Sequence, residues 1–214
     1  MEERCKINMM QGDCMDWMKD KPNNYYDLAI VDPPYGENDA INIIDNKNLS
    51  KQATKRTKYN VFENKKPLDD YYIELIRVSK NQIVWGGNFL GLTGGVVAWN
   101  KNGTAFGEGE IAICSTHKSV SFFEYTWNGM LQGNMKNKET RIHPTQKPVA
   151  LYKWLLQNYA KEGDKILDTH GGSGSICIAC WDLKFDLDWI ELDADYYKEA
   201  VERFKRHKNQ LQMF

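Results

Sequence analysis

The sequence lacks the segments that would place it in a membrane or outside the cell. No stretch of the 214 residues approaches the roughly 18 consecutive apolar residues of a membrane-spanning helix. The start of the chain, Met1–Cys5, has no apolar stretch of the signal-peptide type. The length suits one domain with a sizeable core, so we expect a single cytoplasmic domain over residues 1–214, with no membrane partner.

A disulfide framework and a metal site are also not expected. The five cysteines are odd in number and scattered, which favours reduced thiols. Cys177 and Cys180 form one CxxC pair, but the pair lies in a predicted helix and no second pair accompanies it. Two small side chains that pack on one helix face are therefore the better interpretation.

The net charge of −1 excludes a uniformly basic chain, but the basic residues are unevenly distributed. Between Lys47 and Lys66 there are seven lysines and arginines and one acid, Glu63. The segment 37–66 has little periodicity apart from one helical turn at Ile41–Ile44, which is typical of a functional or disordered loop. A charge run is often only a solvated face. The other interpretation is a mobile loop that contacts phosphates through Lys47, Lys51, Lys55, Arg56 and Lys58.

One corner of the chain combines a carboxylate, two prolines and an aromatic ring. Leu28–Val31 is a continuous apolar run, typical of a short buried strand, and Asp32 follows at its carboxyl end. Pro33 and Pro34 stop the strand, because proline has no N–H to donate to a ladder. The Asp32 carboxylate and the Pro33 carbonyl would accept the two hydrogens of an exocyclic amine, and Tyr35 would stack on its base. The alternative interpretation is a simple turn after a strand.

A second strand end resembles a nucleoside-binding turn. The stretch Ile166–Ser175, ILDTHGGSGS, reads as a strand, a carboxylate, a glycine-rich turn and the start of a helix. Glycines permit tight turns and close approach of a ligand. About twenty residues later, Trp189–Asp193 ends another strand with acids, at the spacing of a ribose-binding carboxylate. A nicotinamide dehydrogenase shares that spacing, but the order GxGxxG is missing here. Lone acids at strand ends can also be helix caps.

The rest of the chain alternates strands and helices, which predicts an α/β sheet. The predicted strands are Lys6–Met10, Leu28–Val31, Gln82–Trp85, Val96–Trp99, Glu110–Ser115, Ser121–Tyr125, Lys165–Leu167 and Leu187–Leu192. The predicted helices are Cys14–Met18 (capped by Asp13), Pro67–Val78, Pro148–Tyr159, Ser175–Leu183 and Asp195–His207. If the strands that end at Asp32 and Asp168 are neighbours, the two acids share one crevice at the point where strand order reverses.

Three blocks together resemble a known family. DPPY at Asp32–Tyr35, HPTQKP at His143–Pro148, and ILDTHGGSGS followed by WIELDADYY at Trp189–Tyr197 are similar to amino-type DNA methyltransferases that use S-adenosylmethionine. The motif order is that of the permuted beta class, in which the catalytic motif precedes the cofactor motif. The resemblance implies a Rossmann-like α/β sheet of about seven strands, mostly parallel with a reversed edge hairpin, and helices on both faces. The chain would begin with the family's third strand and end with its first two.

The resemblance also implies the reaction and the residues that perform it. The reaction is methyl transfer to N6 of adenine in flipped-out double-stranded DNA, without a metal; cytosine N4 and a degenerate, non-catalytic DNA-binding module are the alternatives. The catalytic corner is Asp32, Pro33, Pro34 and Tyr35. The cofactor residues are Asp13, His143, Thr145, Gln146, Lys147, Asp168, Thr169, His170, Gly171, Gly172, Gly174, Glu191 and Asp193.

This chain departs from the family pattern in two respects. The family's cofactor loop usually reads Asp-Pro-Phe, whereas this chain has Asp168-Thr169-His170. No large target-recognition domain is visible, so a minimal recognition segment is expected at 100–141, with a small basic cluster at Lys136, Lys138 and Arg141. Sequence leaves a homodimer open.

Overall fold

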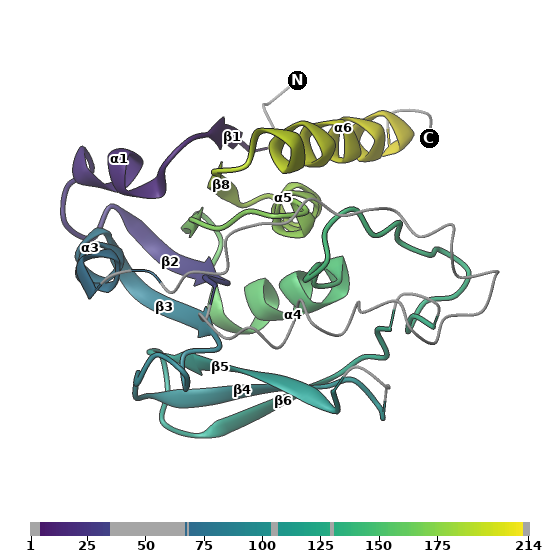
Figure 1. Cartoon of the computed structure of the whole chain (residues 1–214), viewed down its shortest axis with the longest axis horizontal. Coiled ribbons are helices and arrows are strands. Elements are labelled where there is room, and N and C mark those ends of the chain that lie inside the picture. The colour runs from purple at the N-terminus through teal and green to yellow at the C-terminus, as the bar shows by residue number, and fades with distance from the viewer. Residues whose placement is uncertain (1–4, 35–66, 68, 104–106, 129–130, 212–214) are drawn as a thin grey trace, which may run out of the picture.

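The central strands bury both of their faces. In β2 (Tyr26–Val31), Leu28 and Ile30 pack into one core cluster, while Ala29 and Val31 pack into a second cluster on the other face. Successive side chains of a strand point to opposite faces, so a continuous apolar run belongs to a strand that is covered on both sides. The structure is a computed structural model, which describes residues 5–34, 67, 69–103, 107–128 and 131–211 (Figure 1).

Eight strands form one sheet in the order β1-β8-β7-β2-β3-β5-β4-β6. All neighbours pair in parallel except β5, which is antiparallel to both β3 and β4. The strands besides β2 are β1 (Ile7–Gln11), β3 (Ser79–Trp85), β4 (Gly95–Asn100), β5 (Gly109–Cys114), β6 (Val120–Glu124), β7 (Lys165–Asp168) and β8 (Asp186–Glu191).

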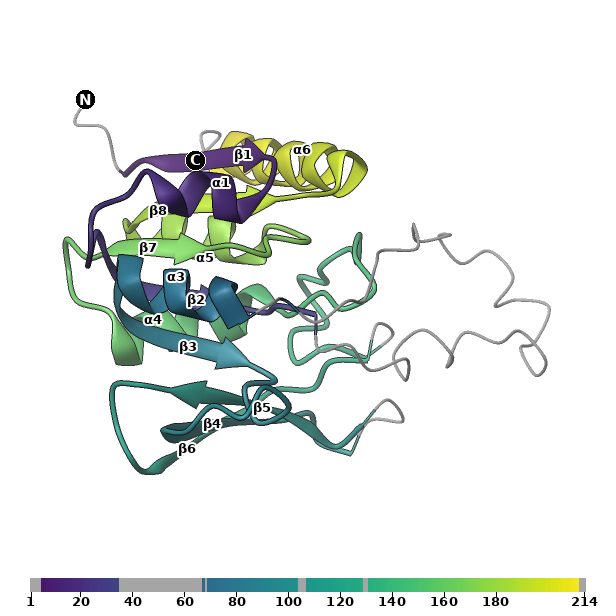
Figure 2. The same cartoon turned by 60° about the vertical axis from the view of Figure 1, so that its left-hand side comes forward.

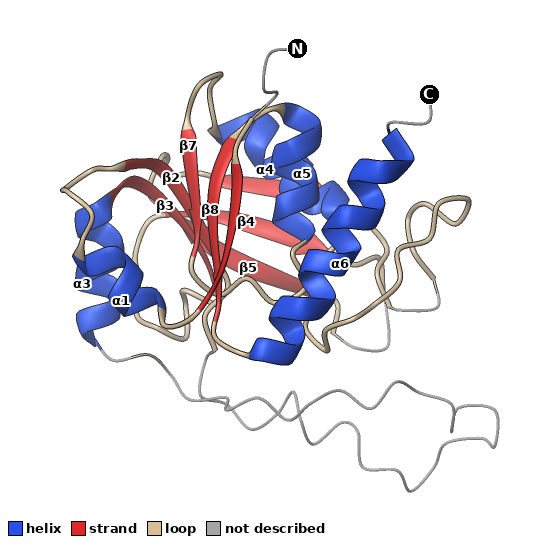
Figure 3. Cartoon of the chain, turned by 90° about the horizontal axis from the view of Figure 1, so that it is seen from above, coloured by secondary structure: helices blue, strands red, loops and turns tan. Residues whose placement is uncertain are grey.

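Helices cover both faces of the sheet (Figure 3). On one face lie α1 (Cys14–Lys19) and α3 (Asp69–Val78); on the other lie α4 (Val149–Tyr159), α5 (Ser175–Leu183) and α6 (Ala194–Leu211). The expected α/β fold, mostly parallel with a reversed strand, is therefore confirmed. The sheet has eight strands rather than about seven, because β6 adds to the outer edge of β4 in parallel. The reversed strand β5 thus lies inside the sheet.

The permuted strand order is confirmed as well. The first strand, β1, pairs with β8, and β8 pairs with β7, so the two ends of the chain meet at one side of the sheet (Figure 1). From β7 the chain winds outward through β8, and from β2 it winds outward through β3 in the other direction. The point where strand order reverses is therefore the β7–β2 pair, with Leu28 opposite Ile166. Open α/β sheets bind ligands at the carboxyl ends of such a pair.

Most element boundaries agree with the sequence pattern, and the exceptions have local causes. β3 starts at Ser79 rather than Gln82, because Ser79 and Asn81 already pair with Tyr26 and Leu28 of β2. α6 continues to Leu211, past the predicted end at His207. No helix of the described part of the chain is long and apolar enough to cross a bilayer. Cys177 and Cys180 are buried and free on α5, as expected for packing residues.

Candidate active site

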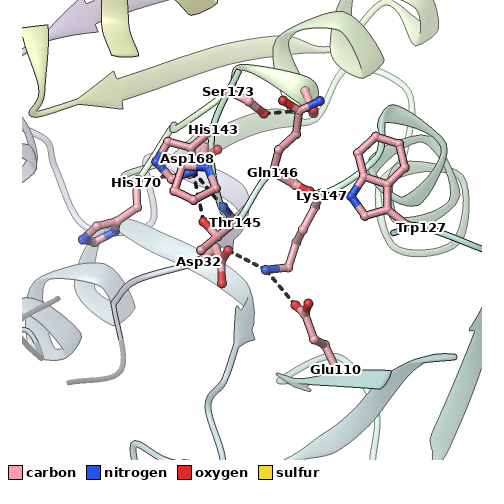
Figure 4. A network of polar contacts seen from close by, with 12 residues as sticks. Asp32, Glu110, Trp127, His143, Thr145, Gln146, Lys147, Asp168, His170 and Ser173 are labelled. Carbon is pink, nitrogen blue, oxygen red and sulfur yellow. Dashed lines mark hydrogen bonds and ion pairs between the residues drawn. The ribbon is translucent and has the colours of Figure 1, made fainter. Parts of the chain in front are cut away.

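Four residues of alternating charge lie in a row at the carboxyl edge of the sheet, and three of them are labelled in Figure 4. Asp32 directly follows β2, Lys147 precedes α4, and Glu110 lies on β5. The Lys147 ammonium donates to Asp32 Oδ2 and lies 3.0 Å from Glu110 Oε2. The other oxygen of Glu110 accepts from Lys101. These contacts therefore join the predicted catalytic corner to the HPTQKP block.

Neighbouring opposite charges keep Lys147 and Glu110 ionised despite the effect of burial. The Lys147 side chain is 3% exposed, and a lone ammonium would be costly at such a position. Burial alone would lower the pKa of Lys147, but the carboxylates of Asp32 and Glu110 outweigh it and raise that pKa. Burial would raise the pKa of Glu110, yet Lys147 and Lys101 bring it down to about 2. At neutral pH Lys147 is thus a cation and Glu110 an anion.

The loop before α4 is held by the side chain of Gln146. Its Oε1 accepts from the Ile142 N–H at 2.9 Å, and its Nε2 donates to the Thr140 carbonyl at 3.3 Å. The indole of Trp127 donates to the Gln146 carbonyl at 2.8 Å. Gln146, which the sequence assigned to the cofactor, therefore fixes its own loop and places the adjacent Lys147.

His143 of the same loop lies over the glycine turn. A Cβ built on Gly172 would be 3.6 Å from His143 Nδ1, and the imidazole meets the Tyr196 ring edge-on at 4.3 Å between centroids. The Thr145 N–H and hydroxyl lie 3.3 and 3.1 Å from His143 Nδ1. Burial, with help from Lys147, lowers the pKa of His143 to about 4. The ring is thus neutral, and the Thr145 N–H assigns its proton to Nε2.

The glycine turn needs its glycines for two different reasons. A Cβ on Gly171 would overlap the Trp189 indole, so this β8 side chain occupies the space beside the turn. Gly172 and Gly174 have φ of 51° and 68°, the left-handed region that favours glycine. The Gly172 N–H donates to Glu191 Oε2 at 2.6 Å, which ties the turn to the end of β8. The indole N–H of Trp189 is buried with no acceptor among the described residues.

Replacing Gly171 with alanine is expected to destabilise the fold by about 1–3 kcal/mol, because the new methyl group overlaps the Trp189 indole. Urea denaturation followed by circular dichroism measures the loss. Trp189→Phe makes room beside the same methyl group, so the double variant should lose less stability than the two single variants added together. Strict additivity would contradict the assigned contact.

The acids at the strand ends have different roles. Asp13 caps α1 by accepting from the Met15 N–H at 2.8 Å, as predicted, and Asp193 accepts from the Asp195 N–H at 2.8 Å at the start of α6. Glu191 is different, because its carboxylate accepts the N–H groups of Gly172 and Asp193 and so shapes the turn. Burial raises the pKa of Glu191.

Asp168 ends β7, which is paired with β2, the strand that leads to Asp32. Its side chain is buried and accepts the His170 N–H at 3.1 Å. Burial raises the pKa of Asp168 to about 8, and the nearby negative charges of Asp32 and Glu191 add to the rise. The two acids are thus electrostatically coupled, as neighbouring strand ends require.

The unusual pair Thr169-His170 turns toward α3. The Thr169 hydroxyl lies 2.6 Å from the Tyr71 hydroxyl, and the His170 ring meets the Tyr71 ring edge-on at 5.1 Å. Burial lowers the pKa of His170 to about 4, so the imidazole is a neutral flat ring at physiological pH. His170 therefore places an uncharged ring at the position where the resemblance leads us to expect phenylalanine.

The predicted recognition segment 100–141 supplies β5 and β6 to the sheet, and its last part projects from the sheet (Figure 1). That part is anchored by Glu139, whose carboxylate accepts from Arg203 of α6 at 2.6 Å and from the Val149 N–H at 3.0 Å. Arg203 also donates to the Ser173 carbonyl of the glycine turn at 2.8 Å. A buried ion pair therefore ties this segment to the turn.

Some predicted residues lie outside the described part of the chain, and some unpredicted ones appear in the crevice. Tyr35, the whole loop 37–66 and its five named basic residues are in the first group. Glu110 and Lys101 are in the second group. The signal in the sequence that could have identified Glu110 is an acid at the start of an otherwise apolar strand. Figure 2 shows β1, β2 and β3 pointing to the same edge of the sheet, and Asp32 directly follows β2 there.

A cavity of about 250 Å³ lies at the opposite edge, near the amino ends of the strands, and Trp17, Lys21 and Asp188 are among its lining residues. Asp188 is fully engaged there, because Asn8 Nδ2 and the Tyr26 hydroxyl donate to its two oxygens at 2.6 and 2.8 Å. We interpret these groups as structural, since they satisfy a buried carboxylate.

Curated relatives of this chain include type II methyltransferases. M2.MboI of Moraxella bovis is 24% identical over an alignment of 250 residues, which covers 96% of this chain and 88% of M2.MboI. M.HpaI of Haemophilus parainfluenzae is 37% identical over 73 residues, which is 34% of this chain and only 23% of M.HpaI.

Solved structures share the fold. M1.HpyAVI in its complex with SAM has a TM-score of 0.58 at 19% identity, over 92% of this chain and 99% of M1.HpyAVI. The cytosine-N4-specific PvuII DNA methyltransferase has a TM-score of 0.59 at 10% identity, over 96% of this chain and 92% of PvuII. TTHA0409 of Thermus thermophilus, complexed with S-adenosyl-L-methionine, has a TM-score of 0.53 at 15% identity, over 94% of this chain and 95% of TTHA0409.

The model of a DNA methylase family, N6/N4 methyltransferases, matches residues 17–202. The matched range includes the Asp32 corner, the HPTQKP block and the glycine turn, which the fold brings to one edge. The chain therefore belongs to the N6/N4 DNA methylase family.

Proposed function

We propose that this protein transfers a methyl group from S-adenosylmethionine to the exocyclic N6 of adenine in DNA. The observation that supports the proposal is the adjacency of two strand ends: Asp32 follows β2, Asp168 ends β7, and these strands pair at the point where strand order reverses. One acid belongs to the amine-binding corner and the other to the glycine turn. The Asp-first corner favours adenine over cytosine.

The glycine turn fits a cationic nucleoside. Gly172 leaves its backbone open, with His143 as the nearest side chain, and Glu191 fixes the turn at the position of a ribose-binding acid. A cationic ligand beside Asp168 and Glu191 would favour the ionised form of both acids. Bound S-adenosylmethionine supplies an activated methyl group on its sulfonium.

The Asp32 corner prepares the amine. An exocyclic amine is a poor nucleophile, because its lone pair is delocalised into the ring. Hydrogen bonds from its two hydrogens to the Asp32 carboxylate and the Pro33 carbonyl favour a pyramidal nitrogen. As that nitrogen attacks, it becomes positive, and the fixed negative charge of Asp32 stabilises it. Asp32 then accepts the proton that the methylated nitrogen must lose.

DNA binding must offset the cost of flipping the base out of the duplex, a few kcal/mol. Lysine and arginine contacts to phosphates provide such energy and weaken as salt is added. We assign these contacts to the five basic residues of the loop 37–66 that the sequence singled out. Lys136, Lys138 and Arg141, beside Glu139, add a second basic cluster in the recognition segment.

Binding of the cofactor is expected to release a proton from Asp168. Burial raises the pKa of this carboxyl to about 8, so it is largely protonated at neutral pH in the free protein. A cationic ligand in the crevice favours the carboxylate and lowers that pKa. Affinity for S-adenosylmethionine should therefore rise with pH and level off above about pH 8. Calorimetry at neutral pH in two buffers of different ionisation enthalpy measures the released proton.

Asp168→Asn is the control for that experiment, because it has no proton to release. The same carboxyl should also lower fold stability as pH rises from about 4 to about 8. Over that range the folded state retains a proton that the unfolded chain has lost, so the slope of stability with pH is negative. Equal apparent binding enthalpies in the two buffers would contradict the assignment.

Transfer of a tritiated methyl group onto unmethylated DNA, followed by nucleoside analysis, tests the proposed function. N6-methyladenine is the expected product. Detection of N4-methylcytosine instead would change the assigned target base to cytosine, and the protein would still be a DNA methyltransferase that acts on an exocyclic amine. Failure to bind S-adenosylmethionine in a calorimetric titration would instead favour a non-catalytic DNA-binding module.

A further inference from the structure

Lys147 occupies the acceptor that the target amine has to use. Its ammonium donates to Asp32 Oδ2, the carboxylate that the proposed reaction needs for the amine. The same ammonium lies 3.0 Å from Glu110 Oε2, on the side of the ammonium away from Asp32 (Figure 4). Because Lys147 donates to Oδ2, an amine that binds at this oxygen displaces the ammonium from it.

We propose that Glu110 is a positioning residue, which retains the Lys147 ammonium when the target amine displaces it from Asp32. This inference rests on the proposed methyl transfer and adds to it a residue that belongs to none of the three family motifs. Asp32 alternates between two donors, the Lys147 ammonium and the amine, and Glu110 is the partner that makes the exchange possible.

The burial of Lys147 makes a second anion necessary. The side chain is 3% exposed, so an ammonium that leaves Asp32 cannot be solvated by water without a large movement. Removing one partner of a buried ion pair is strongly unfavourable unless another partner is present. Glu110 already holds the ammonium, and the Trp85 ring lies 5.1 Å from it on another side.

Glu110 itself is held in place from two directions. Its strand β5 pairs with β3 on one side and with β4 on the other, where Glu110 lies opposite Trp99. Its Oε1 accepts from Lys101, which directs Oε2 toward Lys147. Lys101 is in turn only 11% exposed and lies over the Trp99 ring. The carboxylate is therefore fixed before any substrate arrives.

The titratable and charged groups around Lys147 come from several elements. Asp32 lies at the end of β2, Asp168 at the end of β7, Glu110 on β5, His143 in the same loop and Tyr152 on α4. Burial keeps Tyr152 and His143 neutral near pH 7. Glu110 and Asp32 are thus the two anions that hydrogen-bond to the ammonium, which is why removing one of them should be measurable.

Glu110→Gln is the test, measured by steady-state methyl transfer and by the affinity for S-adenosylmethionine. We expect kcat to fall roughly 10- to 100-fold, because misplacing a catalytic group costs rates of this order. Cofactor affinity should stay within about twofold. Without one of its carboxylates, Lys147 loses its proton more readily, so the alkaline limb of the kcat profile should move to lower pH. Glu110→Asp should restore part of the rate.

Glu162→Gln is the matched control, because Glu162 is an exposed acid in the turn between α4 and β7, outside the recognition segment 100–141. It should leave kcat and its pH profile unchanged. An unchanged kcat profile for Glu110→Gln would overturn the proposal, and so would a loss of activity that merely follows a loss of cofactor affinity. If Glu110→Gln does not fold, Glu110→Asp must show a smaller shift of the same limb, and an unshifted limb in that variant rejects the proposal.

A readout without turnover separates this inference from the proposed function. In protein with ¹³Cε-labelled lysine, NMR titration gives the pKa of Lys147, whose resonance is assigned by its absence in Lys147→Arg. That pKa should be lower in Glu110→Gln than in the natural protein. Absence of methyl transfer by the natural protein would defeat the proposed function, whereas an unchanged Lys147 pKa would defeat the role of Glu110.

Discussion

Asp32→Ala is expected to lower kcat for methyl transfer by roughly 10²- to 10³-fold or more, with little change in affinity for S-adenosylmethionine. The substitution removes both the acceptor for the amine and the negative charge that stabilises the developing cation. The glycine turn is left intact, because its hydrogen bonds run to β8 and not to Asp32. Methyl transfer to DNA and calorimetric cofactor titration on the same preparation measure the two quantities.

Asp32→Asn separates charge from shape. Asparagine keeps one acceptor oxygen and the size of the side chain, but it cannot neutralise Lys147 or the methylated nitrogen. We expect its rate to lie between those of the alanine variant and the natural protein. Thermal denaturation checks that both variants fold. We expect them to fold, because Glu110 still provides a carboxylate for the buried Lys147 ammonium. Full activity in Asp32→Ala would refute the assigned role.

Arg203→Ala is expected to lower the free energy of unfolding by about 3–5 kcal/mol. Arg203 and Glu139 form a buried ion pair, with side chains 9% and 18% exposed, and removing one member leaves the other uncompensated. The Ser173 carbonyl and the Ser175 hydroxyl also lose their donor. A domain is stable by only about 5–15 kcal/mol, so urea denaturation should show a large shift of the midpoint.

The control for Arg203→Ala is Lys205→Ala on the same helix. Lys205 forms an ion pair with Glu202, but their side chains are 63% and 59% exposed, so solvent screens the pair. This variant should leave the denaturation midpoint unchanged. If both variants shift the midpoint equally, the loss reflects α6 as a helix and not the buried ion pair.

Loss of the Arg203 pair should also weaken the active site. Arg203 connects the glycine turn to Glu139, and Glu139 connects to the start of α4. The side-chain amide of Gln132 also makes two hydrogen bonds of 2.8 Å with the backbone of Glu139. At temperatures where the variant is still folded, the affinities for both cofactor and DNA are therefore expected to fall. A normal affinity for both would show that the connection serves stability alone.

The local features of the site were predictable from the sequence. A proline-stopped strand at Asp32 and a glycine turn after Asp168 are local, because proline removes an N–H and glycine alone tolerates the left-handed conformation well. The alternation of apolar runs likewise predicted the strands and helices and their α/β arrangement. The identity of the capping acid Asp13 followed from its place one residue before a helix.

The weaker predictions depended on contacts that no short pattern encodes. The sequence assigned Gln146 and Asp193 to the cofactor, while the structure shows Gln146 bonded to its own loop and Asp193 capping α6. Their cofactor roles stay predictions. The eighth strand was unpredictable as part of the sheet, because β6 can join only where β4 already offers an open edge.

By itself, the sequence determined the two chemical corners, their order along the chain and the family that carries them, since backbone constraints and motif spacing are local. Only the tertiary structure decided that Lys147 meets Asp32, 115 residues away, together with Glu110, and that Arg203 reaches Glu139, 64 residues away. Such pairs form because the sheet brings distant strand ends to one edge and because a buried charge is stable only beside an opposite one.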